Sequence, residues 1–152
     1  MFVVFDLDGT LALIDHRRHF VAGPVKDYRA FFAACDQDQP NTPIIGALRA
    51  HWIAKHEVEI WSGRSDEVRA KTENWLLQYG IPPGLLTRMR SAGDTTPDHV
   101  LKKSWLDDCE KRPDLIFDDR QRVVDTWRAN GITCAQVNAA EWSNPKRRLQ
   151  SP

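Results

Sequence analysis

The sequence lacks a long hydrophobic run, since no stretch approaches the roughly 20 apolar residues that a membrane helix needs. We therefore expect no membrane span and no membrane partner. Cysteine is also scarce: Cys35, Cys109 and Cys134 are odd in number and form no C-x-x-C pair. This pattern predicts reduced thiols and a cytoplasmic protein. The first residues already form an apolar strand pattern, so we expect no signal peptide.

Neither sign of charge is in excess, because 21 Lys and Arg residues balance 21 Asp and Glu residues. Bulk electrostatic attraction to nucleic acid or to an anionic membrane is therefore not indicated, although a local basic patch is compatible with this balance. The sequence also has no G-x-x-x-x-G-K-[ST] segment, so we expect no kinase domain in this chain. Its 152 residues predict one domain over residues 1–140, followed by a polar tail over 141–152.

Apolar runs alternate with helical segments along the chain. The expected strands are 2–5, 57–61, 85–89, 115–117 and 132–137. The expected helices are 42–56, 65–80, 97–111 and 120–130. This order predicts an α/β fold with a Rossmann-like, parallel five-stranded sheet and helices on both faces. Residues 13–40 do not fit a simple crossover, so we expect a small cap insertion with a helix around 28–34.

The most informative segment is FVVFDLDGT, in which an apolar run ends in Asp6 and Asp8. Strand alternation points both carboxylates the same way, and neighbouring carboxylates repel each other unless a cation lies between them. Oxygen ligands with room for water suit Mg²⁺. The alternative interpretation is a tight turn in which both aspartates bond backbone N–H groups.

Polar residues follow other expected strands as well. Ser62-Gly63-Arg64 comes after the second strand, and Asp118-Asp119-Arg120 comes after the fourth. The carboxyl ends of parallel strands share one edge of the sheet, where ligands bind in such folds. Lys102, on the third helix, is placed to point back toward this edge. We therefore expect these side chains to form one site.

The residue types in this site suit phosphoryl transfer. Mg²⁺ held by Asp6, Asp118 and the turn backbone, with Asp8 as a further oxygen ligand, would polarise a phosphoryl group. Asp6 is the expected nucleophile because the strand fixes it most rigidly, and Asp8 is the expected acid and base. Ser62 and Lys102 supply a donor and a positive charge to the phosphoryl oxygens.

The segments DLDGT, WSGR and FDDR, together with Lys102, resemble the four motifs of the haloacid dehalogenase-like (HAD) phosphatase superfamily. A closer likeness covers nearly the whole chain and resembles the 3′-phosphatase domain of tailed-phage polynucleotide kinases. It is carried by residues 90–95, Asp98, Lys102, 115–128 and 131–137.

This resemblance implies Asp6 as nucleophile, Asp8 as acid and base, Asp118 as a Mg²⁺ ligand and Asp119 as a supporting ligand. It also implies the cytoplasm of a bacterium or of a phage-infected host cell. The substrate-binding residues that we assign on this basis are Thr10, Arg17, Arg18, Gly63, Arg64, Arg90 and Arg120.

The functional hypothesis is a Mg²⁺-dependent phosphomonoesterase that acts through an aspartyl-phosphate intermediate. Its substrate is a 3′-phosphate at a nucleic-acid end or nucleotide; free nucleoside 5′-monophosphates or other small phosphate esters are the alternative. A phosphotransferase and a non-catalytic module that binds phosphate ends also remain open. Thr96 and Pro97 stand where the family often has basic residues, which argues for a small substrate.

The segment 17–40 is expected to set substrate choice. It carries aromatic residues that suit a base and adjacent arginines that suit a phosphate. Its candidate stacking residues are Phe20, Tyr28, Phe31 and Phe32. His16 and His19 lie in the same segment, where a contact with substrate and a solvated position are both compatible with the sequence.

Overall fold

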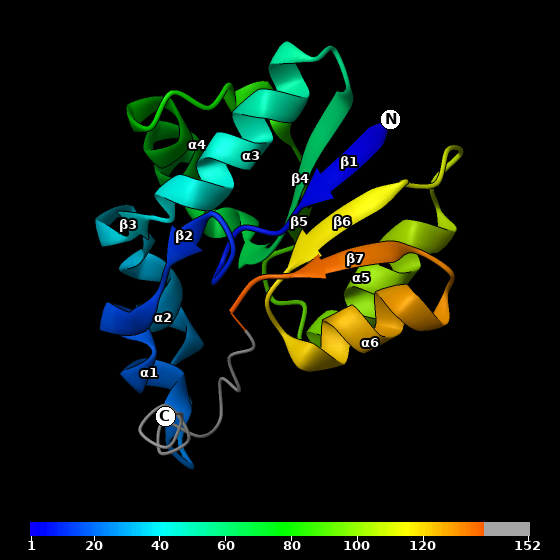
Figure 1. Ribbon diagram of the computed structural model, residues 1–152. Helices are drawn as coiled ribbons and strands as arrows, with labels where there is room; N and C mark the ends of the chain where they lie inside the picture. The colour runs from blue at the N-terminus through cyan, green and yellow to red at the C-terminus, as the bar shows by residue number, and fades with distance from the viewer. Residues whose placement is uncertain (139–152) are drawn as a thin grey trace, which may run out of the picture.

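The computed structural model describes residues 1–138, so the predicted tail over 141–152 lies outside the described residues (Figure 1). Five parallel strands form the main sheet in the order β5-β4-β1-β6-β7. They are β1 Phe2–Phe5, β4 Glu57–Ser65, β5 Leu86–Arg90, β6 Leu115–Asp118 and β7 Thr133–Gln136. The predicted α/β class and the five strands are thus confirmed.

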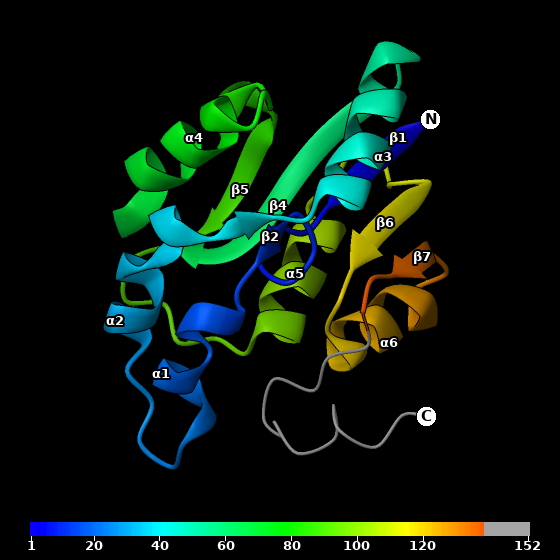
Figure 2. The same ribbon diagram turned by 60° about the vertical axis from the view of Figure 1, so that its left-hand side comes forward.

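Two pairs of helices cover the two faces of the sheet (Figures 1 and 2). The helices α3 Thr42–Ile53 and α4 Arg69–Gln78 pack on one face, and α5 Asp98–Asp107 and α6 Gln121–Ala129 pack on the other. Short 3₁₀ turns, η3 Asp66–Val68 and η4 Pro83–Leu85, precede α4 and β5. The side chains of β1 alternate between the two cores, which is the period-2 pattern of a strand buried on both faces.

Some predicted boundaries were wrong. The strand β4 continues through Ser62, Gly63 and Arg64, which were expected to follow it, and its pairing with β5 is irregular between Ser62 and Ser65. Such a bulge lets a strand end change direction beside a site. The helix expected to run to residue 111 ends at Asp107.

The chain reverses its direction of travel across the sheet beside β1. After β5 at one edge it returns to place β6 directly against β1. The segments that leave the carboxyl ends of β1 and β6 therefore diverge and open a crevice between them. The Asp6 N–H still donates to the Phe117 carbonyl at 2.9 Å, so the two strand ends remain tied together at the crevice.

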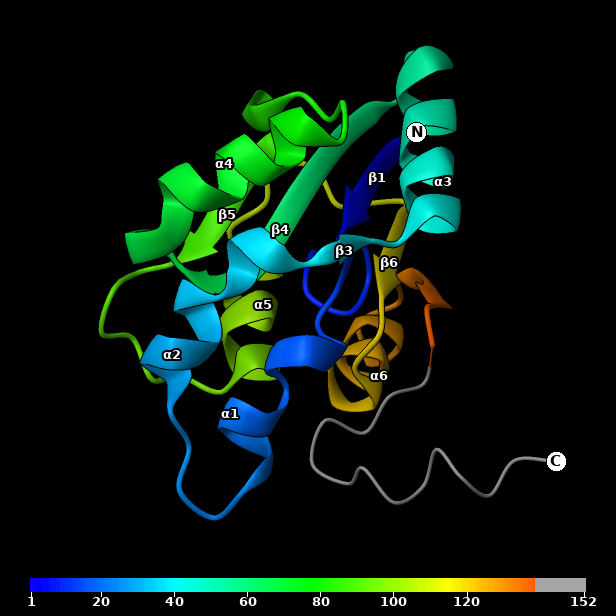
Figure 3. The ribbon, with the colours of Figure 1, turned by 90° about the vertical axis from the view of Figure 1, so that its left-hand side faces the viewer.

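The insertion begins and ends on a two-stranded antiparallel ribbon, β2 Ala12–Leu13 with β3 Gln39–Pro40. Between these strands lie η1 Asp15–Arg17, α1 His19–Ala22, α2 Tyr28–Ala33 and η2 Cys35–Gln37. Figures 2 and 3 show α1 and α2 beyond the carboxyl ends of the main strands. Asp27 starts α2 by accepting the Ala30 N–H at 2.9 Å. Within residues 1–138, no helix is long and apolar enough to cross a membrane.

Replacing Phe5 should show how far the site depends on the core beneath it. Phe5 is fully buried next to Asp6, and its ring stacks on Phe117 with the centroids 4.5 Å apart. We expect Phe5→Ala to lower the free energy of unfolding by about 3–5 kcal/mol, measured by urea denaturation. The exposed Leu77 provides the control, because Leu77→Ala should change it by no more than about 0.5 kcal/mol. Equal losses for the two variants would contradict this packing.

Candidate active site

Three carboxylates meet where β1 and β6 end. Asp6 follows β1, Asp118 closes β6 and Asp119 comes next in the chain. All three residues are buried, and one oxygen from each lies within 4.8 Å of the others. The sequence placed these residues at adjacent strand ends, and the structure brings them together. We refer to Asp6, Asp118 and Asp119 as the carboxylate triad.

Lys102, on α5, bonds two of the three triad carboxylates. Its Nζ donates to Asp6 Oδ1 at 2.7 Å and to Asp118 Oδ2 at 2.9 Å. Asp98, one helical turn earlier, lies 3.5 Å from the same nitrogen. Burial alone would lower the pKa of Lys102, but these three acids raise it well above its ordinary value. Lys102 is therefore a permanent cation at this place.

Burial raises the pKa of Asp6 to about 7, with a further contribution from Asp118, although Lys102 opposes the shift. The Thr10 hydroxyl donates to the second Asp6 oxygen at 3.2 Å. Asp6 thus has a fixed orientation, but its ionised form needs more positive charge than Lys102 supplies.

Asp8 belongs to a second group, in which two guanidinium groups lie between two carboxylates. Arg17 and Arg64 each donate to Asp8 Oδ1 at 2.7 Å, and to Asp38 Oδ2 at 2.6 and 2.8 Å. Burial alone would raise the pKa of Asp8, but the two arginines outweigh it and lower the pKa to about 2. We call Asp8, Arg17, Asp38 and Arg64 the arginine–aspartate cluster.

The arginine–aspartate cluster places Arg17 and Arg64 outside the residues that line the cavity. Both were predicted to bind substrate, yet both are fully buried behind Asp8. Arg17 also donates to the Phe31 carbonyl at 3.2 Å, and Arg64 donates to the Thr72 hydroxyl at 3.1 Å. In the structure these two side chains contact Asp8, which itself faces the cavity.

The turn after Asp6 requires glycine. Gly9 has a φ of +83°, and a Cβ there would overlap the Asp119 carboxylate. The Leu7 carbonyl accepts the N–H groups of Thr10, Leu11 and Ala12 at 3.2, 3.0 and 2.9 Å. The turn therefore carries its backbone directly past the carboxylate triad.

The residues at the site fit a hard divalent cation. The triad offers only oxygen ligands, which is the donor type that Mg²⁺ prefers. Charge supports this fit: among the described residues, five buried carboxylates face three buried cationic side chains. They are Asp6, Asp8, Asp38, Asp118 and Asp119, against Arg17, Arg64 and Lys102. Asp8, predicted as a ligand, lies in the arginine–aspartate cluster and is not one of the three grouped carboxylates.

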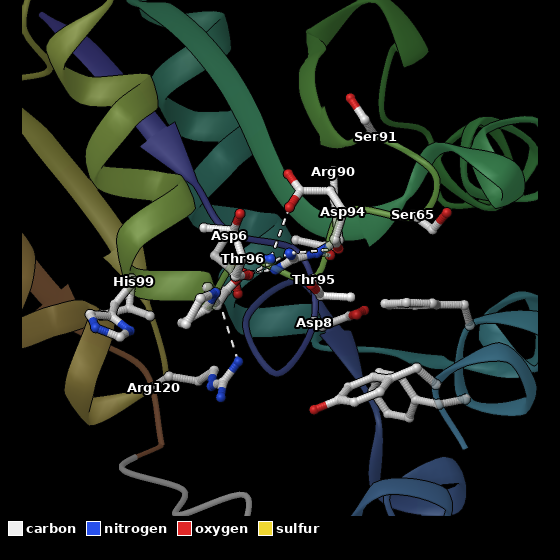
Figure 4. Close-up of a pocket in the computed structure, with 18 of the residues that line it drawn as sticks. Asp6, Asp8, Ser65, Arg90, Ser91, Asp94, Thr95, Thr96, His99 and Arg120 are labelled. Atoms are coloured by element: carbon white, nitrogen blue, oxygen red, sulfur yellow. Dashed lines mark hydrogen bonds and ion pairs between the residues drawn. The ribbon is translucent and has the colours of Figure 1, made fainter. Parts of the chain in front are cut away.

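A cavity of about 660 Å³ opens in front of Asp6 and Asp8. Figure 4 shows Asp6, Asp8, Thr95 and Arg120 around its middle, with Ser65 and Ser91 at its periphery. One wall comes from α2, and the other comes from the segment 90–99 together with the start of α6. Its volume is in the range of pockets that hold nucleotide-sized ligands.

The remaining predicted site residues take different places. Arg120 lines the cavity, with its Nη1 3.5 Å from Asp98. Arg90 also lines it, but its guanidinium bonds the Gly63 carbonyl at 2.9 Å and the Thr96 carbonyl at 2.6 Å, so it shapes the wall. Gly63 lines the same cavity, and a Cβ there would overlap Asp98. Arg18 lines a separate small hollow beside Gly9 and Asp119.

Ser62 lies outside the residues that line the cavity. It is fully buried within β4, and its hydroxyl accepts the Arg64 N–H at 3.2 Å. His16 Nε2 lies 2.7 Å from Asp38 Oδ1, and the ring of His19 packs on Phe20 with the centroids 4.1 Å apart. Neither histidine is in the acidic group that suits a metal.

Sequence reasoning gave no role to Asp38 or Asp98. Asp38 bonds residues that are 21 and 26 positions away, and no local pattern in the insertion marks it. The sequence did contain a signal for the role of Asp98, because this residue begins α5 four residues before Lys102. Burial raises the pKa of Asp98, but Lys102, Arg120 and Arg90 together hold it below its ordinary value.

Comparison with known proteins identifies the family. Residues 1–142 match the model of the polynucleotide kinase PNKP phosphatase domain, a HAD family. The chain belongs to this family. It is therefore a HAD-family phosphatase, as the sequence motifs predicted.

Two solved structures of the Pnkp1/Rnl/Hen1 complex, one described as an RNA repair complex, contain similar chains. They are 35% and 34% identical to this chain over 92% of its length, each with a TM-score of 0.78. This chain spans 46% and 43% of those chains. A HAD family enzyme from Bacteroides thetaiotaomicron, solved with magnesium and inorganic phosphate, shares the fold at 12% identity and a TM-score of 0.53, over 97% of this chain and 98% of that one.

Asp38 should be essential to the arginine–aspartate cluster. Asp38→Asn leaves Arg17 and Arg64 with Asp8 as their one remaining buried carboxylate partner in the cluster. Because an uncompensated buried charge is costly, we expect a loss of about 3–5 kcal/mol in the free energy of unfolding, measured by urea denaturation. Asp36→Asn is the matched control, since that side chain is 42% exposed. A loss for Asp38→Asn no larger than the control's would rule out this role.

Proposed function

We propose that the chain removes 3′-phosphates from nucleic-acid ends by way of a phosphoryl group carried on Asp6. The observation that carries the proposal is that Asp6 belongs to the buried carboxylate triad and also lines, together with Asp8, the large cavity. Membership of the PNKP phosphatase family supports the polynucleotide substrate, as do the similar chains in an RNA repair complex.

The carboxylate triad would hold Mg²⁺, the ion present in the Bacteroides HAD enzyme. When bound there, the ion supplies Lewis acidity to the phosphoryl oxygens and balances buried negative charge. Its charge also opposes the effect of burial on Asp6 and favours the ionised, nucleophilic carboxylate.

In the first step, an Asp6 oxygen attacks phosphorus and forms the acyl-phosphate bond. The ester P–O bond breaks, and its electron pair stays on the 3′ oxygen of the leaving alcohol. A protonated Asp8 gives its proton to that oxygen. Asp8 first takes this proton from solvent, because the approaching phosphate adds negative charge, which raises the pKa of Asp8 and opposes the effect of Arg17 and Arg64.

In the second step, the Asp8 carboxylate accepts a proton from a water molecule as that water attacks phosphorus. The bond between phosphorus and Asp6 breaks, which releases inorganic phosphate and restores the Asp6 carboxylate. Asp8 serves as acid and then as base, while Arg17 and Arg64 hold it in one orientation.

Lys102 and Arg120 complete the electrostatics of the reaction. Lys102 lies against Asp6, so its charge favours the increase in negative charge on the phosphoryl oxygens. Arg120 lies on the cavity wall at the start of α6, where it can meet a non-bridging oxygen of the substrate phosphate.

The cavity favours a polymer end over a small phosphate ester. Arg29, on α2 of the insertion, and Arg122, on α6, both line it and are exposed to solvent. Two cationic side chains on opposite walls suit the next phosphodiester of a chain. They place positive charge at the cavity although the net charge of the protein is zero.

Asp6→Asn should abolish turnover and keep the fold. The amide cannot form the acyl phosphate, and the change removes one of several crowded negative charges, so stability should be unchanged or higher. Phosphate release from a 3′-phosphorylated oligonucleotide measures the loss, and thermal unfolding checks the fold. Substantial phosphate release by folded Asp6→Asn would exclude Asp6 as the nucleophile.

Activity should require a hard divalent cation, with Mn²⁺ able to replace Mg²⁺. Asp118→Ala should raise the Mg²⁺ concentration at half-maximal rate and lower the maximal rate, because it removes a ligand and leaves the nucleophile. Asp108→Ala, outside the triad at the end of α5, should change neither. Full activity in excess chelator would contradict the metal requirement.

The substrate class is tested by one panel of phosphate esters. The proposal predicts a higher kcat/KM for 3′-phosphorylated oligonucleotides than for nucleoside 3′- or 5′-monophosphates. Equal or higher values for free 5′-nucleotides would favour the small-molecule alternative.

A further inference from the structure

The cavity has one aromatic wall, which the phosphoryl chemistry does not use. Tyr28 and Phe32 lie four residues apart on α2, so they share one face of that helix, and both line the cavity. Their ring centroids are 6.2 Å apart and their planes are inclined by 32°. Tyr28 is 52% exposed, which leaves a large part of its ring open to a ligand.

Packing accounts for the other aromatic residues of the insertion. Phe31 is only 2% exposed, and the Arg17 guanidinium lies over its ring, 4.3 Å from the centroid. Phe31 also lines the cavity, but its buried ring packs against Arg17 and so supports the arginine–aspartate cluster. Phe20 packs against the small core of the insertion and does not line the cavity. Of the four aromatic residues that the sequence indicated for stacking, the structure leaves Tyr28 and Phe32 available.

The middle of the opposite wall consists of small, uncharged side chains. Thr95, Thr96 and Pro97 line it, and the Arg90 guanidinium fixes this segment by bonding the Asp94 and Thr96 carbonyls at 3.2 and 2.6 Å. A flat, apolar-faced group can enter between such a wall and the aromatic rings. Asp6 and Asp8 line the same cavity, so a phosphate on the same ligand can reach the catalytic carboxylates.

We propose that Tyr28 and Phe32 form a subsite that stacks the base of the terminal nucleotide, whose 3′-phosphate lies at Asp6. This inference rests on the proposed function and adds a specificity element to it. Stacking uses the face of a base and does not read its edge, so the subsite accepts any of the four bases. It discriminates a terminal nucleotide from a phosphate ester without a base.

Two 3′-phosphorylated oligonucleotides test the subsite. They have the same length and differ only at the last nucleotide, which carries a base in one and is an abasic tetrahydrofuran analogue in the other. For the wild-type chain we expect kcat/KM to be roughly tenfold higher with the base, the size of effect that one stacked base gives. In the double variant Tyr28→Ala/Phe32→Ala this ratio should fall to about one.

Two further variants separate stacking from folding. Tyr28→Ser alone changes a half-exposed ring and should lower the ratio in a protein with wild-type thermal stability. Val25→Ala is the matched control, because Val25 lies in the same insertion, is 86% exposed and does not line the cavity. The control should keep the wild-type ratio.

The outcomes distinguish this inference from the function on which it rests. Wild-type activity on both oligonucleotides with a ratio near one would overturn the base subsite and leave the 3′-phosphatase proposal standing. Equal losses on both substrates in the Tyr28 and Phe32 variants would assign these rings a structural role and also overturn it. Failure of the wild-type chain, supplied with Mg²⁺, to act on either oligonucleotide would overturn the proposed function itself.

Discussion

The structure depends on one electrostatic constraint: within residues 1–138, five buried carboxylates converge at one edge of the sheet with three buried cationic side chains among them. Arg17 and Arg64 balance Asp8 and Asp38, whereas Lys102 bonds Asp6 and Asp118 of the carboxylate triad. The buried acidic groups thus outnumber the buried cationic ones, and a divalent cation would offset this excess. Burial of carboxylates without such compensation is strongly unfavourable. The same imbalance that costs stability is what makes the site fit a metal and a phosphoryl group.

The main sheet positions some of these buried charged residues, and the insertion positions the others. The sheet places the carboxylate triad, because β1 and β6 are neighbours at the point where the strand order reverses. The insertion supplies Arg17 and Asp38, and through them it orients Asp8. The insertion also provides the aromatic wall of the cavity. One segment therefore connects the positioning of the acid–base residue with the surface that meets the substrate.

The sequence predicted the fold and included Asp6, Asp118 and Asp119 among its metal-ligand candidates, because both depend on local signals. Apolar runs that end in acids identify strand ends, and the strand–helix alternation dictates which ends meet. It could not predict the arginine–aspartate cluster, whose bonds join residues 9, 21, 26 and 56 positions apart. Sequence motifs alone assign Arg17 and Arg64 to substrate binding, since arginines near a phosphate site commonly bind the phosphate. Only the three-dimensional packing shows that both arginines lie behind Asp8.

The most direct test of this account is the free energy of unfolding as a function of Mg²⁺ concentration, measured by urea denaturation at constant ionic strength. If the ion binds the triad of the native state and does not bind the unfolded chain, the free energy of unfolding rises with the logarithm of the Mg²⁺ concentration above the dissociation constant. The account predicts this increase for the wild-type chain and a much smaller one for Asp118→Asn. Equal stability in Mg²⁺ and in Na⁺ at matched ionic strength would contradict the claim that the buried charge imbalance is a cation site.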